Sequence, residues 1–271
     1  MIRNLFIATL LALGAVSCSD IKESDRFITI EGVTAERVVL LEDFTGQNCV
    51  NCPAAHQEID ALVKQYGDAL VPVAIHAGSF GIPSTNRRPG LMQPEGQTYN
   101  DRYGIDEYPK GVINGRSGAL NPGEWSDFLR EELQVPAELD IDLSATISAD
   151  EPGKIAVECI LRPDANMQGT LQLWVLEDGI VARQLDKDGN LIPDYVHNHV
   201  YRAAVNGVDG ENVTLQANTH KTLAYTVGIR NTDKEAWVPE NLSIVAFLRQ
   251  ADGGVAQAAK CHVVTGDVEE E

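Results

Sequence analysis

The sequence is short of basic residues and of aromatic residues. Lys and Arg number 21 against 40 Asp and Glu, the formal net charge is −19, and aromatic residues make up 6% of the chain. A surface this acidic repels phosphate groups, so nucleic acid and anionic membrane surfaces are poor partners. The apolar fraction of 44% is nevertheless ordinary for a globular protein, and 271 residues suffice for two domains.

The N-terminal apolar run, Leu5 to Val16, is too short to span a bilayer as a stable helix. Because Arg3 precedes it and small residues follow it, the pattern predicts a signal peptide over residues 1–17. Ala15-Val16-Ser17-Cys18 resembles the bacterial lipobox, in which the cysteine is lipid-modified after cleavage. We therefore expect lipidation at Cys18 and a membrane tether over residues 18–26; an ordinary signal peptide cleaved nearby is the alternative.

Two of the five cysteines, Cys49 and Cys52, stand where a helix is expected to begin. Arg37 to Phe44 predicts a buried strand, the next four residues predict a turn, and the residues after Cys52 predict a helix ending near Tyr66. A thiol at a helix N-terminus faces unpaired N–H groups and the positive end of the dipole, so the thiolate is favoured. Cys49 is therefore the expected nucleophile, and Cys52 can reach it across one helical turn.

This stretch resembles the thioredoxin superfamily in more than the two cysteines. Asp43 lies six residues before the first cysteine and matches the buried acid that exchanges protons with the second cysteine in that family. The segment around Tyr108-Pro109-Lys110 resembles the one in which a cis-proline begins a strand and shapes the substrate groove. The resemblance implies a catalytic set of both cysteines, Asp43 and a cis Pro109, with Tyr108 and Lys110 at the substrate.

The coarse pattern predicts two folded parts. Leu70 to His76 predicts a second buried strand and thus a β-α-β unit, so residues 27–135 are expected to form an α/β thioredoxin-like domain. Beyond Pro136 short alternating runs separated by turn signals predict an all-β sandwich, immunoglobulin-like or jelly-roll-like, over residues 136–266. An acidic tail follows at residues 267–271.

The predicted sandwich contains two pairs of reactive side chains. Cys159 and Cys261 lie on predicted strands and could form a structural disulfide in an oxidising compartment; burial as separate thiols is the alternative. His197 and His199 are two residues apart, so on a strand both would face one side, a spacing that zinc or copper can use. Hydrogen bonding within a loop–strand junction is the alternative, and no metal or cofactor is expected.

Three segments together resemble the twenty-eight-kilodalton outer membrane protein family of Bacteroidetes-type bacteria. They are Leu41 to Pro53, Trp174 to Ile180 and His197 to Arg202. The resemblance covers nearly the whole mature chain and implies an outer membrane lipoprotein that faces the periplasm or the cell surface. Members of this family are described as surface lipoproteins, with an adhesin or receptor role suggested.

Two functions follow as hypotheses. The first is a thiol–disulfide oxidoreductase that acts on thiols or disulfides of envelope proteins, with its direction open because Asn48 replaces the tryptophan usual in thioredoxins. The second is a non-catalytic binding protein or adhesin in which Cys49 and Cys52 form a stable disulfide. A zinc site at this cysteine pair would need two further ligands, and the sequence has no second pair of this spacing.

Overall fold

The computed structural model describes residues 36–85 and 89–266. The predicted signal peptide, the lipidation site Cys18, the tether and the acidic tail lie outside these residues. None of the helices in the described ranges is long and apolar enough to cross a membrane.

The described elements alternate strand and helix at first and are then almost entirely strands. In chain order they are β1 (Val39–Thr45), α1 (Cys52–Tyr66), η2 (Gly67–Ala69), β2 (Leu70–His76), η3 (Gly78–Phe80), α2 (Pro94–Arg102), β3 (Lys110–Ile113), α3 (Pro122–Glu132), β4 (Leu139–Ile147), β5 (Lys154–Pro163), β6 (Met167–Glu177), β7 (Ile180–Leu185), β8 (Leu191–His197), β9 (Val200–Ala204), β10 (Glu211–Leu215), β11 (Lys221–Gly228), η4 (Pro239–Asn241), β12 (Leu242–Arg249), β13 (Val255–His262) and β14 (Val264–Thr265). The bounds of β2 and the end of α1 agree with the sequence prediction.

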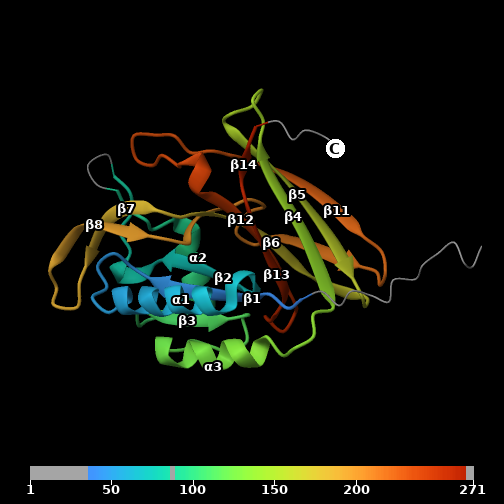
Figure 1. The fold of residues 1–271 in the computed structure, drawn as a ribbon, viewed down its shortest axis with the longest axis horizontal. Helices are drawn as coiled ribbons and strands as arrows, with labels where there is room; N and C mark the ends of the chain where they lie inside the picture. The colour runs from blue at the N-terminus through green and yellow to red at the C-terminus, as the bar shows by residue number, and fades with distance from the viewer. Residues whose placement is uncertain (1–35, 86–88, 267–271) are drawn as a thin grey trace, which may run out of the picture. The chain divides into compact units, whose positions relative to one another are not determined.

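One large sheet runs through both halves of the chain (Figure 1). Its strand order is β13-β12-β6-β9-β2-β1-β3, with β10 paired to β6. Strands β1 and β2 are parallel, β3 is antiparallel to β1, and β2 meets β9 through the register pair Ala74 and Val200. The N-terminal strands are thus a continuation of the strands that follow Pro136.

This sheet shows that the predicted fold class is wrong. We expected an α/β thioredoxin-like domain followed by a sandwich, but β1, β2 and β3 share their sheet with β6, β9, β12 and β13. The physical reason is that the edge of β2 is closed by β9, about 125 residues later in the chain. The described residues instead form a β-rich fold of mixed sheets.

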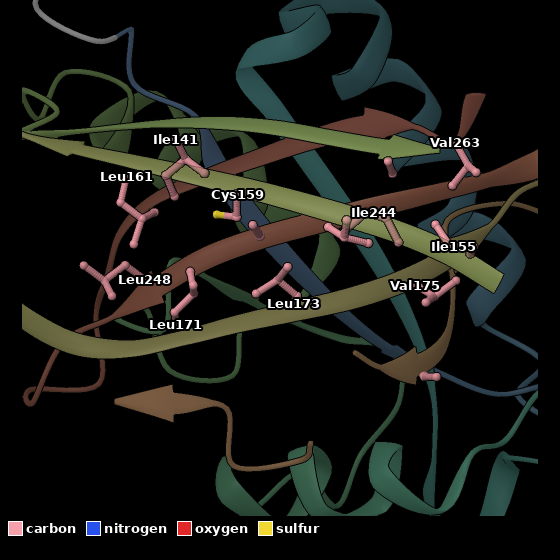
Figure 2. Packing of buried hydrophobic residues seen from close by; sticks show 14 of the residues in the cluster. Ile141, Ile155, Cys159, Leu161, Leu171, Leu173, Val175, Ile244, Leu248 and Val263 are labelled. Carbon is pink, nitrogen blue, oxygen red and sulfur yellow. The ribbon is translucent and has the colours of Figure 1, made fainter. Parts of the chain in front are cut away.

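A four-stranded sheet, β11-β5-β4-β14, packs against β6 and β12 of the large sheet. Alternate residues of β5 are buried, as expected for a strand with one face on a core. Figure 2 shows Cys159 and Leu161 of β5 on the side that faces Leu171, Leu173 and Leu248. The apolar faces of the two sheets thus enclose one core.

The helices cover the other half of the large sheet. Leu41 on β1 packs with Ile59 on α1 and Trp125 on α3, so these two helices share one face. Tyr99 on α2 lies on the opposite face, where its ring stands 4.8 Å from that of Trp174. Alternate residues of β1 therefore face α1 and α2, which decides which side chains can meet the cysteines.

Candidate functional site

Cys49 and Cys52 form a disulfide at the start of α1, with their Cα atoms 5.5 Å apart. No described side chain caps the first turn of this helix, and Pro53 stands within it. Cys52 is the first residue of the helix and Cys49 precedes the N-cap Asn51 by two residues, so the pair lies at the helix start. The two residues are only 2% and 0% exposed, so the disulfide is shielded from solvent.

Asp43 lies on the α1 face of β1. Its side chain is fully buried, and neither carboxyl oxygen has a hydrogen-bond partner in the part of the chain that the structure describes. Burial without a partner disfavours the charged form and raises the pKa of Asp43 to about 8. The nearest ionisable contact is Nε2 of His56, 3.8 Å from Oδ2. A carboxyl that titrates near neutral pH can take up or release a proton beside the helix start.

The Tyr108–Pro109 peptide bond is cis, as predicted. The register of β1 and β3 puts Lys110 opposite Phe44, so Pro109 lies where β1 leads into the cysteine turn. The Tyr108 ring stands 5.5 Å from that of Phe80, whose carbonyl accepts a hydrogen bond from the backbone of Asn48 at 3.0 Å. Tyr108, Pro109 and Lys110 are all half-buried and border the turn that carries Cys49.

The hairpin of β7 and β8 is bonded to the cysteine turn, which the sequence did not predict. The amide of Gln184 donates to the carbonyls of Cys49 at 2.9 Å and Gly46 at 3.4 Å. The backbone N–H of Leu185 donates to the carbonyl of Gln47 at 3.0 Å. Gln184 is fully buried, so these bonds replace water at the turn.

A cluster of histidines adjoins this site. His56, one helical turn after Cys52, bonds Thr45 Oγ1 at 3.0 Å and the hydroxyl of Tyr195 at 2.9 Å. Burial lowers the pKa of His56 and of His197 to about 4. Burial and the neighbouring rings also hold the pKa of His76 well below its ordinary value. These three imidazoles are therefore neutral at pH 7.

The common strand face considered for His197 and His199 is absent, and His199 instead pairs within a loop–strand junction, which is the alternative given above. His197 ends β8 with its side chain buried, whereas His199 follows in a turn with a φ of 58° and pairs with Asp178 at 3.1 Å. A two-residue spacing places side chains on one face only while the backbone stays extended. In residues 36–85 and 89–266 no group of three or more His, Cys, Asp or Glu is arranged to hold a metal ion.

Cys159 and Cys261 are free thiols rather than the disulfide that we considered. Cys159 is buried on β5 and Cys261 is partly buried on β13, in the core between the sheets. Burial raises the pKa of Cys159 to about 12 and that of Cys261 to about 11. Both thiols are therefore protonated and unreactive at neutral pH.

Several polar groups at the site escaped the sequence analysis. The spacing of Cys52 and His56, four residues on one helix, could have placed both on the same helix face. Gln184 and Tyr195 carried no such signal, because they reach the turn through a hairpin far away in sequence.

The Omp28 family, described as outer membrane protein Omp28, matches residues 96–266. The structure of HBP35 of Porphyromonas gingivalis has a TM-score of 0.68 at 15% identity, over 88% of this chain and 79% of that one. Protein AGR_C_4864 from Agrobacterium tumefaciens has a TM-score of 0.51 at 14% identity, over 87% and 98%. These two likenesses show a shared fold.

A domain of the outer membrane lipoprotein Omp28 from Porphyromonas gingivalis is 24% identical, with a TM-score of 0.36 over 48% of this chain and 92% of that one. The search of curated proteins found no match.

Proposed function

The chain belongs to the outer membrane protein Omp28 family, and on that premise we propose that it exchanges thiols and disulfides with proteins of the cell envelope. Its family is one of outer membrane proteins, and the proposal includes a lipid anchor at Cys18. The observation that carries the proposal is the Cys49–Cys52 disulfide at the first turn of α1, on the face of β1 where Asp43 is buried. A helix start favours the thiolate of the first cysteine, and a nearby acid can accept the proton of the second.

The exchange proceeds in two steps when the pair is reduced. The Cys49 thiolate attacks one sulfur of a client disulfide, forming a mixed disulfide and releasing one client thiolate. Cys52 then gives its proton to Asp43 in the ionised fraction that a pKa of about 8 leaves near neutral pH, and it attacks Cys49, which releases the second client thiolate and leaves the Cys49–Cys52 disulfide. Two electrons pass to the client, and an external thiol protein restores the pair. The reverse sequence oxidises a client dithiol.

The substrate groove in this proposal runs beside the cis-proline. Tyr108, Pro109 and Lys110 border the cysteine turn and are half-buried, so a client peptide would meet their exposed parts. Because Cys49 is 2% exposed, a client sulfur reaches it only after a local opening. The bonds from Gln184 to the turn are the contacts that such an opening would break.

A second function is favoured by the same burial. With Cys49 and Cys52 almost without exposed surface, the disulfide would close the turn permanently and the protein would act by binding a partner. This proposal makes the chain a surface-binding protein or adhesin whose disulfide stabilises its fold. Catalytic turnover of a client disulfide is expected only for the first function, so it distinguishes the two.

The test is the reduction of insulin by dithiothreitol, catalysed by the chain with Cys18→Ser to keep it soluble. We expect acceleration that Cys49→Ser abolishes, whereas Cys261→Ser, a substitution at a partly buried thiol away from the site, leaves the rate unchanged. Equal rates with and without Cys49 would exclude exchange and leave the binding role.

A trapping experiment identifies the client. In a Cys52→Ser variant the mixed disulfide is not resolved, so client proteins of the envelope should remain attached to Cys49 and separate on reduction. The Cys49→Ser, Cys52→Ser double variant is the control. Adducts of equal amount in both variants would mean that capture does not pass through Cys49.

A further inference from the structure

A small cavity of about 40 Å³ lies between α1, β2 and the connection from β8 to β9. Pro72, Ala74 and His76 of β2 form its buried side, because alternate residues of this strand face α1. The exposed side chains of Asp60 and Asn198 stand at its rim, so the cavity communicates with solvent. Its volume suffices for a single ion or for very few water molecules.

His76 and His197 line this cavity with unpartnered ring nitrogens. Both residues are 2% exposed, and none of their four nitrogens has a hydrogen-bond partner among the described residues. The carbonyls of Ala182 and Arg183 act on the pKa of His197 without meeting hydrogen-bond geometry. A buried polar group without a partner is destabilising, and a shared ion would satisfy one nitrogen of each ring.

The two rings are placed to share that ligand. Their centroids lie 5.3 Å apart with the ring planes inclined by 67°, and both residues line the same cavity. The ring of His56 stands 6.2 Å from that of His197, but both nitrogens of His56 already bond Thr45 and Tyr195. The available donor set is therefore two imidazoles.

We propose that His76 and His197 form a two-histidine site for copper(I). Imidazole nitrogen is a ligand for copper, and the filled d shell of copper(I) imposes no fixed geometry, so two donors can hold the ion in a bent arrangement. Zinc takes four ligands, which the described residues do not supply here. Magnesium and calcium require oxygen donors.

The surrounding charges accommodate one positive charge. Arg202 is a buried cation whose charge lowers the pKa of His76. Its guanidinium, however, pairs with Glu177 at 3.1 Å and with Glu235 at 2.7 Å. The carboxylate of Asp60 stands at the rim. A monovalent ion is thus admitted more readily than a divalent one, whose desolvation costs more.

The test measures copper(I) binding by anaerobic competition with bicinchoninate. All variants carry Cys18→Ser, Cys159→Ala and Cys261→Ala and keep the Cys49–Cys52 disulfide, so that no thiol binds the ion. We expect one copper(I) per chain, and an affinity lowered by about 100-fold or more in His76→Gln and in His197→Gln, since even an outer-shell partner is worth about 10–100-fold. His220→Gln, at an exposed histidine, is the matched control and should bind normally.

Silver(I) serves as a redox-inert second probe and should raise the unfolding temperature of the background chain but not of His76→Gln. Thermal unfolding without metal checks that each variant is folded. Equal affinities in His76→Gln and His220→Gln, no stoichiometric copper(I), or zinc bound as tightly as copper(I) would each overturn the proposal. Because the disulfide stays intact, none of these outcomes depends on thiol exchange.

Discussion

Replacing Asp43 by asparagine should stabilise the protein, and the gain should grow with pH. The carboxyl is fully buried and lacks a hydrogen-bond partner among the residues described. Asparagine has nearly the same shape and no charge to desolvate. The variant therefore removes the ionisation of this position while leaving the packing of β1 against α1 in place.

The pKa of Asp43 fixes the sign and the size of the effect. Burial raises this pKa from 3.8 in the unfolded chain to about 8 in the folded one. Because the folded pKa is the higher one, the stability linked to this carboxyl is complete below pH 4 and is lost as the pH rises through 8. Each pH unit within that window costs about 1.4 kcal/mol, so the whole window costs roughly 6 kcal/mol.

Urea unfolding of both chains between pH 5 and 9, with the disulfide intact, measures this difference. The free energy of unfolding of Asp43→Asn should gain about 1.4 kcal/mol per pH unit over the parent up to pH 8 and then level off. Asp209→Asn, at an exposed aspartate, is the control and should follow the parent. Parallel curves for the parent and Asp43→Asn would refute the assignment of a raised pKa to this carboxyl.

Three further substitutions test other parts of the site and the core. Gln184→Ala removes the bonds to the cysteine turn, so the free energy of unfolding should fall by about 1–3 kcal/mol and dithiothreitol should reduce the disulfide faster, unlike in exposed Gln216→Ala. Arg249→Met leaves the buried Glu42 carboxylate without its cation and should cost about 3–5 kcal/mol in urea unfolding. His197→Gln should flatten the loss of stability as the pH falls from 6.5 through 4, because the folded pKa of His197 is about 4.

Local patterns predicted the elements of the site well. The apolar run before the cysteines is β1, the helix beginning at Cys52 ends at Tyr66, and the peptide bond before Pro109 is cis. Each of these features depends on residues close together in sequence: strand alternation, a helix start and a tyrosine–proline pair. The disulfide between Cys49 and Cys52 likewise joins residues that are close together in sequence.

The partners of these elements were not predictable in the same way. β2 is buried at every residue, which indicates cover on both faces but not the identity of the neighbouring strand. β8 is exposed at four of its seven residues and contains a proline, so no alternation of apolar and polar residues marks it as a strand. The hairpin that carries Gln184 and Tyr195 to the cysteine turn was therefore missed, and the joining of β2 to β9 with it.

The shared sheet leads to a prediction about the N-terminal part alone. On the α2 face, Leu40, Phe44 and Ile75 pack in one cluster with Trp174 and Phe247, which come after residue 135. A chain ending at residue 135 would expose this cluster and the edge of β2, and each large buried side chain left in water costs about 1.5–3 kcal/mol.

Such a loss exceeds the free energy of unfolding of a typical domain of about 100 residues. We therefore expect this fragment to lack cooperative unfolding and to be cleaved rapidly by trypsin. The full chain, cleaved under the same conditions, is the control. A fragment that unfolds cooperatively and resists trypsin would show that β9 is not needed to complete the sheet. Since β9 and the β7–β8 hairpin both follow residue 135, the surroundings of the disulfide are made jointly by the two halves of the chain.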